Sequence, residues 1–334
     1  MRRDFLLYSQ LAPVSYITEP VPDPPERAVI AIGAFDGVHR GHRALLDLCV
    51  ADARSRGVKA VAVTFDPDPD TVVSPHPAPK LLTRDDRLAA LAASGVDRVL
   101  VVPFTPGLAA LGHEEFLLSV LAPWVSIAAI HVGSDFRLGA RGASTVEVVR
   151  AWGEGQDIEV FGHDLVMDTE HSSHEVISAS RIRAHVAEGE LERASHMLGR
   201  RYMVRGTVVH GRGEGSQMGF PTANISRGEL IQMPVDGVYA GWALVTPNDG
   251  VRLAYPTAVN VGLPPMFADD PASATLEATL LGFEGDLYGH EVGILFDRML
   301  RRPVHFASRD GLIQAVRSNI DEVAGELGAM PVQL

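Results

Sequence analysis

The sequence predicts a two-domain protein, in which an α/β domain built on a doubly wound parallel sheet precedes a small antiparallel β-barrel with a terminal helix. In the first half, continuous apolar runs alternate with helical patterns, which is typical of parallel strands covered by helices. In the second half, short apolar runs recur between Gly, Pro and Asp turns, as they do in small barrels. The 334 residues suit two domains of roughly 150 residues each. We place these domains at residues 1–187 and 188–334.

The first half supplies the elements of the parallel sheet in order. We expect strands at 28–32, 58–65, 98–102 and 127–132, with helices at 43–56, 84–94 and 114–121. Ligands of such sheets bind at the carboxyl ends of the strands. The segments 33–42 and 66–70 directly follow two of these strands, so both are candidates for a ligand site.

The second half begins after a charged helical connection at 188–201. Barrel strands are predicted at 202–209, 237–245, 253–261, 275–281 and 292–296, and the terminal helix at 310–327.

Composition excludes several classes of function. The net charge is −13 and the basic residues do not cluster, which argues against nucleic acid as a partner. Cys49 is the only cysteine, so an intrachain disulfide or a cysteine zinc site is excluded, and its apolar helical setting favours a core position. No apolar run approaches the roughly 20 residues that cross a bilayer, and the N-terminal apolar stretch ends too early for a signal peptide. We therefore expect a cytoplasmic protein, without a prediction for its oligomeric state.

Lysine is nearly absent, and this limits how phosphate can be bound. Lys59 and Lys80 are the only two lysines, and no stretch has the Gly-x-x-x-x-Gly-Lys-Ser/Thr pattern of a P-loop. Any phosphate must be held by histidine, arginine, backbone N–H groups or a metal ion.

Residues 33–42 read Gly-Ala-Phe-Asp-Gly-Val-His-Arg-Gly-His and link a predicted strand to a predicted helix. The helix start offers N–H groups and a positive dipole end to an anion. His39 and His42 lie three residues apart, so both can point to one side and stabilise a transferring phosphate. Two alternatives are a polar turn with surface histidines and a metal site of both histidines with Asp36. The strand–turn–helix context favours phosphate.

Residues 177–183 read Ile-Ser-Ala-Ser-Arg-Ile-Arg where another helix should begin. A serine here is a good N-cap, so capping alone explains the pattern. The alternative is that Ser180 and Arg183 bind the distal phosphates of a nucleotide.

These two segments resemble motifs of a known family. His39-Arg40-Gly41-His42 and 178–183 resemble the His-x-Gly-His and Ser-Ser-Thr-x-x-Arg motifs of nucleotidyltransferases. The stretches 31–46, 63–67 and 131–139 resemble the FMN adenylyltransferase half of bacterial bifunctional riboflavin kinase/FAD synthetase. The resemblance implies a Rossmann-like nucleotidyltransferase fold and a flavin-phosphate contact at Asp66. It also implies an ATP site made of Gly33, Phe35, Asp36, His39, His42, Asp135, Ser180 and Arg183.

The first half departs from this family at three positions. Ala179 stands where the family usually has a second serine, and Ser180 where it has threonine, so one hydroxyl is missing. Asp68 replaces a common histidine before Pro69. These changes bear on the rate of adenylyl transfer more than on the fold.

A second candidate site lies in the barrel half, where the glycine-rich stretch 211–215 precedes Gly-Phe-Pro-Thr-Ala-Asn at 219–224. Thr222 and Asn224 offer a hydroxyl and an amide oxygen two residues apart, and hard oxygen ligands suit Mg²⁺. A flexible hairpin loop with a proline-fixed turn is the alternative.

This segment resembles the riboflavin kinase signature. The resemblance implies that Thr222 and Asn224 bind Mg²⁺ and that Glu277 is the catalytic base. A carboxylate is needed because a protonated alcohol is a poor nucleophile, although the sequence alone favours a charged strand face for Glu277. The implied nucleotide-binding glycines are Gly211, Gly213, Gly215 and Gly219. Ser216 and Met266 depart from the family pattern.

Together these resemblances imply an enzyme that phosphorylates riboflavin to FMN and adenylylates FMN to FAD, with ATP, riboflavin and FMN as small-molecule substrates and Mg²⁺ as cofactor. Three alternatives stay open: a kinase with an impaired adenylyltransferase half, a flavin-binding regulator without turnover, and a nucleotidyltransferase for another phosphorylated alcohol. The kinase signature argues against the third.

Overall fold

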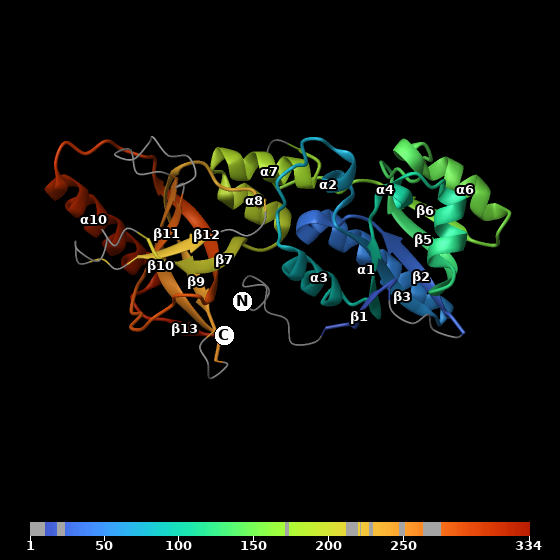
Figure 1. Cartoon of the computed structure of the whole chain (residues 1–334), viewed down its shortest axis with the longest axis horizontal. Helices are drawn as coiled ribbons and strands as arrows, with labels where there is room; N and C mark the ends of the chain where they lie inside the picture. The colour runs from blue at the N-terminus through green and yellow to red at the C-terminus, as the bar shows by residue number, and fades with distance from the viewer. Residues whose placement is uncertain are drawn as a thin grey trace. The chain divides into compact units, whose positions relative to one another are not determined.

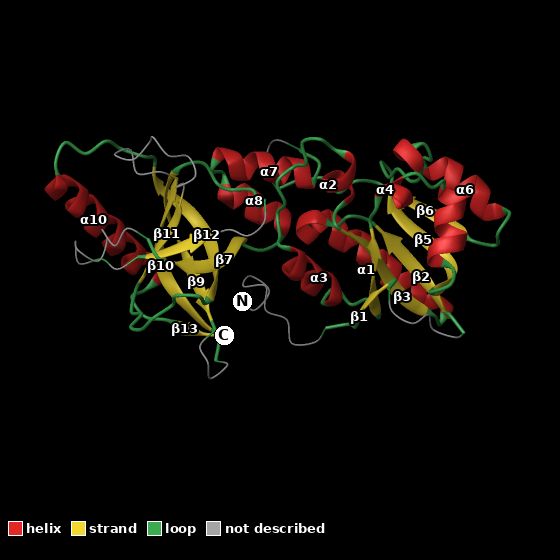
Figure 2. Cartoon of the chain, in the orientation of Figure 1, coloured by secondary structure: helices red, strands yellow, loops and turns green. Residues whose placement is uncertain are grey.

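The computed structural model describes residues 11–18, 24–170, 174–211, 220, 222–226, 230–246, 251–262 and 275–334. Contacts divide the chain into two compact units. The first contains the described residues up to Pro79 and those from Arg84 to Ala179, and the second contains Lys80–Thr83 and the described residues from Ser180 onward. Helices surround a sheet in the first unit, whereas the second is built around a barrel of strands (Figure 2).

The first unit holds a six-stranded sheet in the order β1-β4-β3-β2-β5-β6, with every pairing parallel. The strands are β1 (Val14–Tyr16), β2 (Glu26–Ile32), β3 (Lys59–Asp66), β4 (Arg98–Pro103), β5 (Val125–Gly133) and β6 (Glu159–His163). The central strands are apolar and buried, as a sheet covered on both faces requires. This confirms the predicted doubly wound parallel sheet.

Helices cover both faces of this sheet. Figure 1 shows α1 (Arg40–Arg56) and α3 (Arg84–Ala92) on one side and α6 (Val146–Glu154) on the other. Shorter helices lie in the connections: η2 (Asp36–Val38), α2 (Pro69–Val73), α4 (Pro106–Ala109), α5 (His113–Glu115), η3 (Phe116–Leu121) and η4 (Ala140–Gly142). The predicted helix 114–121 is thus divided between α5 and η3, a π-helix.

Helix α1 has clear signals at both ends and a buried face. His39 caps its start, because its Nδ1 accepts the His42 backbone N–H at 3.3 Å. Gly57 ends it in the left-handed conformation at φ 67°, which glycine adopts without strain. Cys49 is fully buried on this helix, as predicted from its apolar setting.

The second unit contains a closed antiparallel barrel with the strand order β11-β8-β7-β12-β9-β10. Pairing of β10 with β11 closes it, and β13 adds to one end of β10. The strands are β7 (Tyr202–Val209), β8 (Ala223–Ser226), β9 (Gly237–Val245), β10 (Leu253–Gly262), β11 (Thr275–Leu280), β12 (Glu291–Arg301) and β13 (Val332–Gln333). The predicted barrel is confirmed.

Among the described residues, the barrel is accompanied by the helices α7 (Ala179–Glu188), α8 (Leu191–Leu198) and α10 (Arg309–Leu327). The terminal helix α10 begins after Ser308, whose hydroxyl accepts the Gly311 N–H at 3.1 Å. Its Val323 is fully buried in a cluster with Ala240 and Ala258. Burial of this apolar face explains why the helix packs on the barrel.

The division by contacts falls at the start of α7, between Ala179 and Ser180. Residues 80–83 belong to the second unit, and Lys80 bonds there to the backbone on both sides of Ile231. The boundary that we predicted at 187/188 stays a prediction. Within the described residues, no helix is both long and apolar enough to cross a membrane.

Candidate functional sites

The two predicted phosphate-binding histidines lie together where β2 runs into α1. Their rings stack with centroids 3.6 Å apart and an interplanar angle of 18°. His39 is 5% exposed and its Nδ1 caps α1, so its Nε2 is the ring nitrogen that could serve a ligand. A side chain at Gly41 would come within 3.1 Å of the His39 ring, which explains the glycine between them.

Phe35 packs its ring against His42 and against the glycine-rich turn. Its ring is 1% exposed, meets the His42 ring edge-on at 5.2 Å, and would lie 3.2 Å from any Cβ at Gly33. Phe35 has φ 55°, and the following turn, η2, includes Asp36. A left-handed phenylalanine is strained, and such outliers occur preferentially at functional sites. Gly33, Phe35, Asp36, His39 and His42 therefore lie in one short segment at the carboxyl end of β2.

A second loop of the first unit follows β3 and carries Asp66 and Asp68. The Asp66 carboxylate accepts a hydrogen bond from Arg84 Nε at 2.8 Å. The Asp68 carboxylate pairs with Arg87, whose guanidinium is 4% exposed. Both arginines come from α3, one turn apart. The sequence analysis missed both, because nothing in the pattern of α3 connects them to a loop 16 or more residues earlier.

Asp135 lies just beyond the carboxyl end of β5 and is exposed. Its Oδ1 bends back over the strand end, where it would be 2.9 Å from a Cβ at Gly133. β5 lies beside β2, so Asp135 and the 33–42 turn follow neighbouring strands in the sheet. Their joint role in ATP binding stays a prediction.

Ser180 and Arg183 lie on the first turn of α7 in the second unit. Arg183 Nη2 donates to Ser180 Oγ at 3.2 Å, so these two predicted phosphate ligands are brought together. That they share a site with His39 and His42 stays a prediction.

The predicted kinase residues are close neighbours in the barrel. Glu277 of β11 is directly opposite Asn224 of β8 in the antiparallel register, so both side chains lie on one face. Thr222 comes two residues before Asn224, just outside β8. A Cβ at Gly211 would collide with the Asn224 amide group, so any other residue there would have to displace that amide.

Several predicted positions of the kinase half lie outside the described residues. They are Gly213, Gly215 and Gly219 of the predicted nucleotide loop and the two departures Ser216 and Met266.

A polar network that the sequence analysis did not find runs from α1 to β6. His131 of β5 bonds through Nε2 to Asp52 Oδ2 at 3.1 Å and through Nδ1 to His163 Nε2 at 2.9 Å. Arg56 then joins Asp52 at 2.8 Å to Glu159 at 2.7 Å. Because the ionised Asp52 can only accept, His131 donates from Nε2 and, when neutral, accepts from His163.

The surroundings shift the titration of this network. Burial lowers the pKa of His131 below its ordinary value, although Asp52 opposes the shift. Burial, followed by the charge of His131, also lowers the pKa of His163. Burial alone would raise the pKa of Asp52, but the hydrogen bonds from Arg56 and His131 outweigh it and keep that pKa low.

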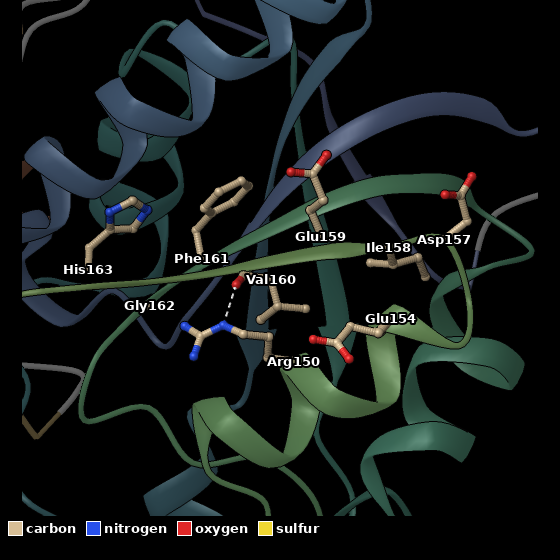
Figure 3. Close-up of a pocket in the computed structure, with 10 residues that line it drawn as sticks. Arg150, Glu154, Asp157, Ile158, Glu159, Val160, Phe161, Gly162 and His163 are labelled. Carbon is tan, nitrogen blue, oxygen red and sulfur yellow. Dashed lines mark hydrogen bonds between the residues drawn. The ribbon is translucent and has the colours of Figure 1, made fainter.

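His163 also borders a pocket of about 520 Å³ between α6 and β6 (Figure 3). Glu154, Asp157 and Glu159 are among the residues that line it, and Arg150 Nε donates to the Val160 carbonyl at 3.1 Å. β6 is the edge strand of the sheet on this side. None of the residues that line the pocket is a predicted site residue.

One cluster among the described residues has the composition of a metal site. His185, Glu188 and Glu190 have ligand atoms within 4.8 Å of one another at the turn between α7 and α8. The Glu190 carboxylate already accepts from His185 at 2.8 Å and Arg193 at 3.1 Å. These bonds explain the cluster as an ion-paired helix turn.

Comparison with known proteins assigns a family to each half. The family model described as FAD synthetase matches residues 21–181, and the one described as riboflavin kinase matches residues 198–326. A protein from Pseudomonas fluorescens, named bifunctional riboflavin kinase/FMN adenylyltransferase, is 33% identical over 300 residues, covering 89% of this chain and 92% of its own length. The chain belongs to this bifunctional family. The resemblance predicted from the motifs is therefore confirmed.

Other relatives of the same name agree. The Escherichia coli K12 protein is 34% identical over 291 residues, with 86% of this chain and 89% of the relative covered. A solved structure named as a macrolide-efflux protein from Streptococcus pneumoniae is 26% identical, has a TM-score of 0.80, and covers 94% of this chain and 99% of its own. The likeness to this solved structure thus extends over both units of the chain.

Proposed function

We propose that this chain makes both flavin cofactors in sequence. The barrel transfers the γ-phosphoryl group of ATP to the ribityl 5′-hydroxyl of riboflavin, giving FMN. The parallel-sheet unit then joins FMN to the adenylyl group of a second ATP, giving FAD and pyrophosphate. The observation that carries the proposal is the serial match of the two family models, FAD synthetase over residues 21–181 and riboflavin kinase over residues 198–326.

In the kinase reaction, Glu277 accepts the proton of the riboflavin hydroxyl as its oxygen bonds to the γ-phosphorus. The opposed register of Glu277 and Asn224 supports this role, because it brings a base next to a predicted metal ligand. The donor set of Thr222 and Asn224 fits Mg²⁺, which prefers hard oxygen ligands. Bound Mg²⁺ would neutralise phosphate charge, and Gly211 would let the backbone approach.

In the adenylyl transfer, the nucleophile is a phosphate oxygen of FMN, which is already an anion and needs no base. It bonds to the α-phosphorus of ATP while the bond to the bridging β-phosphate oxygen breaks. Catalysis is then placement and charge stabilisation. His39 would donate from Nε2, because its Nδ1 caps α1. His42, Ser180 and Arg183 would complete the grip on the phosphates.

The remaining ligands of this unit follow the loops at the strand ends. Gly33, Phe35, Asp36 and Asp135 would contact ATP, and Asp66 would lie at the flavin phosphate. A negative residue near a phosphate needs a cation beside it, and Arg84 at 2.8 Å from Asp66 meets that requirement. We place the protein in the cytoplasm with small-molecule substrates and no nucleic acid, in line with its net charge of −13.

The test is incubation of the protein with riboflavin, ATP and Mg²⁺, followed by chromatographic separation of FMN and FAD. We expect FMN first and FAD later. Glu277→Gln should stop FMN formation but leave FAD formation from supplied FMN, and His42→Ala should do the reverse. Each variant thus serves as the folding control for the other. If riboflavin gives FMN but neither riboflavin nor supplied FMN gives FAD, only the kinase activity remains. Flavin binding without consumption of ATP would refute both proposed activities.

A further inference from the structure

Arg87 is a buried charge that no predicted role explains. It lies on α3 with a 4% exposed side chain. Its Nη1 donates to the Ala34 carbonyl at 2.8 Å and pairs with Asp68, and its Nη2 donates to the Phe65 carbonyl at 2.9 Å. A buried guanidinium is stable only when its charge and its donors are satisfied, and here two backbone carbonyls and a carboxylate satisfy them.

The three partners belong to two different loops. Ala34 lies in the 33–42 turn after β2, whereas Phe65 and Asp68 lie at the end of β3 and in the loop that follows. The ladder between β2 and β3 ends at Ile32, with one more bond from the Gly33 N–H to the Val63 carbonyl at 3.1 Å. Arg87 connects the segments that follow β2 and β3 just beyond the point where the hydrogen-bond ladder between these strands stops.

This position distinguishes Arg87 from a buried arginine that only stabilises the core. In a parallel sheet the carboxyl ends of the strands are where ligands bind. Both loops that Arg87 joins carry predicted ligands: His39 and His42 on one, Asp66 on the other. Arg84, one turn earlier on α3, bonds to Asp66 itself.

We propose that Arg87 is a positioning residue for adenylyl transfer, with Asp68 as its counter-ion. It fixes the spacing between the ATP-phosphate loop and the flavin-phosphate loop, so that the FMN phosphate meets the α-phosphorus in line. Arg87 does not touch either substrate and acts through the two loops. The inference rests on the proposed function of the first unit.

The chemistry of the side chain explains why arginine is required. Its planar fork reaches three acceptors in different directions at once. A lysine at this position keeps the charge but cannot make the same set of bonds. Asparagine at position 68 keeps an oxygen acceptor for Arg87, so Asp68→Asn is a conservative change, whereas Asp68→Ala removes the acceptor.

The experiment measures kcat and KM for FAD formation from FMN and ATP, with riboflavin phosphorylation by the same polypeptide as the internal folding control. We expect Arg87→Lys to lower kcat roughly 10- to 100-fold, because a small misplacement of reacting groups is enough for such a loss. KM for each substrate should change by less than about 3-fold, since the ligands themselves remain. Asp68→Asn should restore most of the kcat that Asp68→Ala loses.

Arg98→Lys is the matched control. Arg98 is a half-buried arginine of the same sheet that donates to the Trp124 carbonyl at 3.2 Å, but it lies at the opposite, amino end of β4. Arg98→Lys should leave both FMN formation and FAD formation unchanged at temperatures well below the melting temperature. The proposal is overturned if folded Arg87→Lys forms FAD with the kcat of the wild type. It is also overturned if Arg87→Lys and Arg98→Lys lose both activities to the same extent.

Two further outcomes are decisive. If Arg87→Lys does not fold, Asp68→Ala and Asp68→Asn are compared in the same way, and equal kcat values for them overturn the proposal. If the wild-type protein forms FMN but no FAD, the proposed function of the first unit fails and the inference falls with it. Failure of the inference, which is seen only in the variants, is therefore distinguishable from failure of the proposed function, which is seen in the wild type.

Discussion

Acid should destabilise the first unit through the network of Asp52, His131 and His163. Because the pKa of His131 is lowered on folding, the unfolded chain binds more protons than the folded chain near pH 6. Stability from this residue is therefore present above the unfolded pKa of 6.5 and is lost as the pH falls below it. Asp52 acts in a lower window, since its lowered pKa adds stability that is lost only below its ordinary value of 3.8.

The size of the effect follows from proton linkage. A histidine that stays neutral when folded and titrates normally when unfolded loses about 1.2 kcal/mol of stability between pH 7 and 5.5. Burial disfavours the charged form of His131, which is 4% exposed, but Asp52 opposes this shift, so the contribution of His131 should stay below the upper limit. His163 is half-buried and should contribute less, because solvent stabilises its charged form.

Urea unfolding at the two pH values measures this loss. Two of the three tryptophans, Trp124 and Trp152, lie in the first unit, so fluorescence in a Trp242→Phe background reports that unit. His131→Gln should lose most of the pH dependence, and replacement of the exposed His76 by Gln should not change it. If His131→Gln loses as much free energy on acidification as the parent protein, the reasoning is wrong.

Three other predictions concern single residues and the metal. Gly211→Ala should lower FMN formation by roughly 10- to 100-fold, because the new Cβ displaces the Asn224 amide, and FAD formation from supplied FMN should persist; equal loss of both rates contradicts this. Burial, followed by the charge of Asp52, raises the pKa of Cys49 to about 12, so iodoacetamide at pH 8 should leave the mass of the folded protein unchanged and add one adduct in urea. Chelation of Mg²⁺ should abolish FMN formation and restored Mg²⁺ should return it, whereas chelator-resistant turnover would exclude a metal role for Thr222 and Asn224.

Much of the fold could be predicted because the strongest signals are local. Central strands such as β2 and β3 are buried on both faces, so their sequences are continuously apolar. β1 has three residues, and β6 is a half-buried edge strand, so neither carries enough periodicity to be found. A helical pattern of apolar residues also cannot predict that residues 113–121 are divided between α5 and a π-helix.

From the residues alone, the candidate sites were predictable only where their members are close in sequence, and the distant members came from the family resemblance. His39 and His42, or Thr222 and Asn224, share one segment, and the register of β8 and β11 then brings Glu277 to Asn224. The contact of Arg87 with Asp68 joins side chains 19 residues apart, and that of His131 with Asp52 joins side chains 79 residues apart. Their pairing follows from the packing of helices on the sheet, which no local pattern of residues encodes.

The closure of the barrel has a consequence for how this family can diversify. β11 is bonded to β8 on one side and β10 on the other, so Glu277 sits in the middle of a strand without a free edge. The proton acceptor that we propose is therefore held by backbone pairing on both of its sides. If Glu277 has the proposed role, we expect that selection can alter which alcohol is admitted while this carboxylate keeps its place.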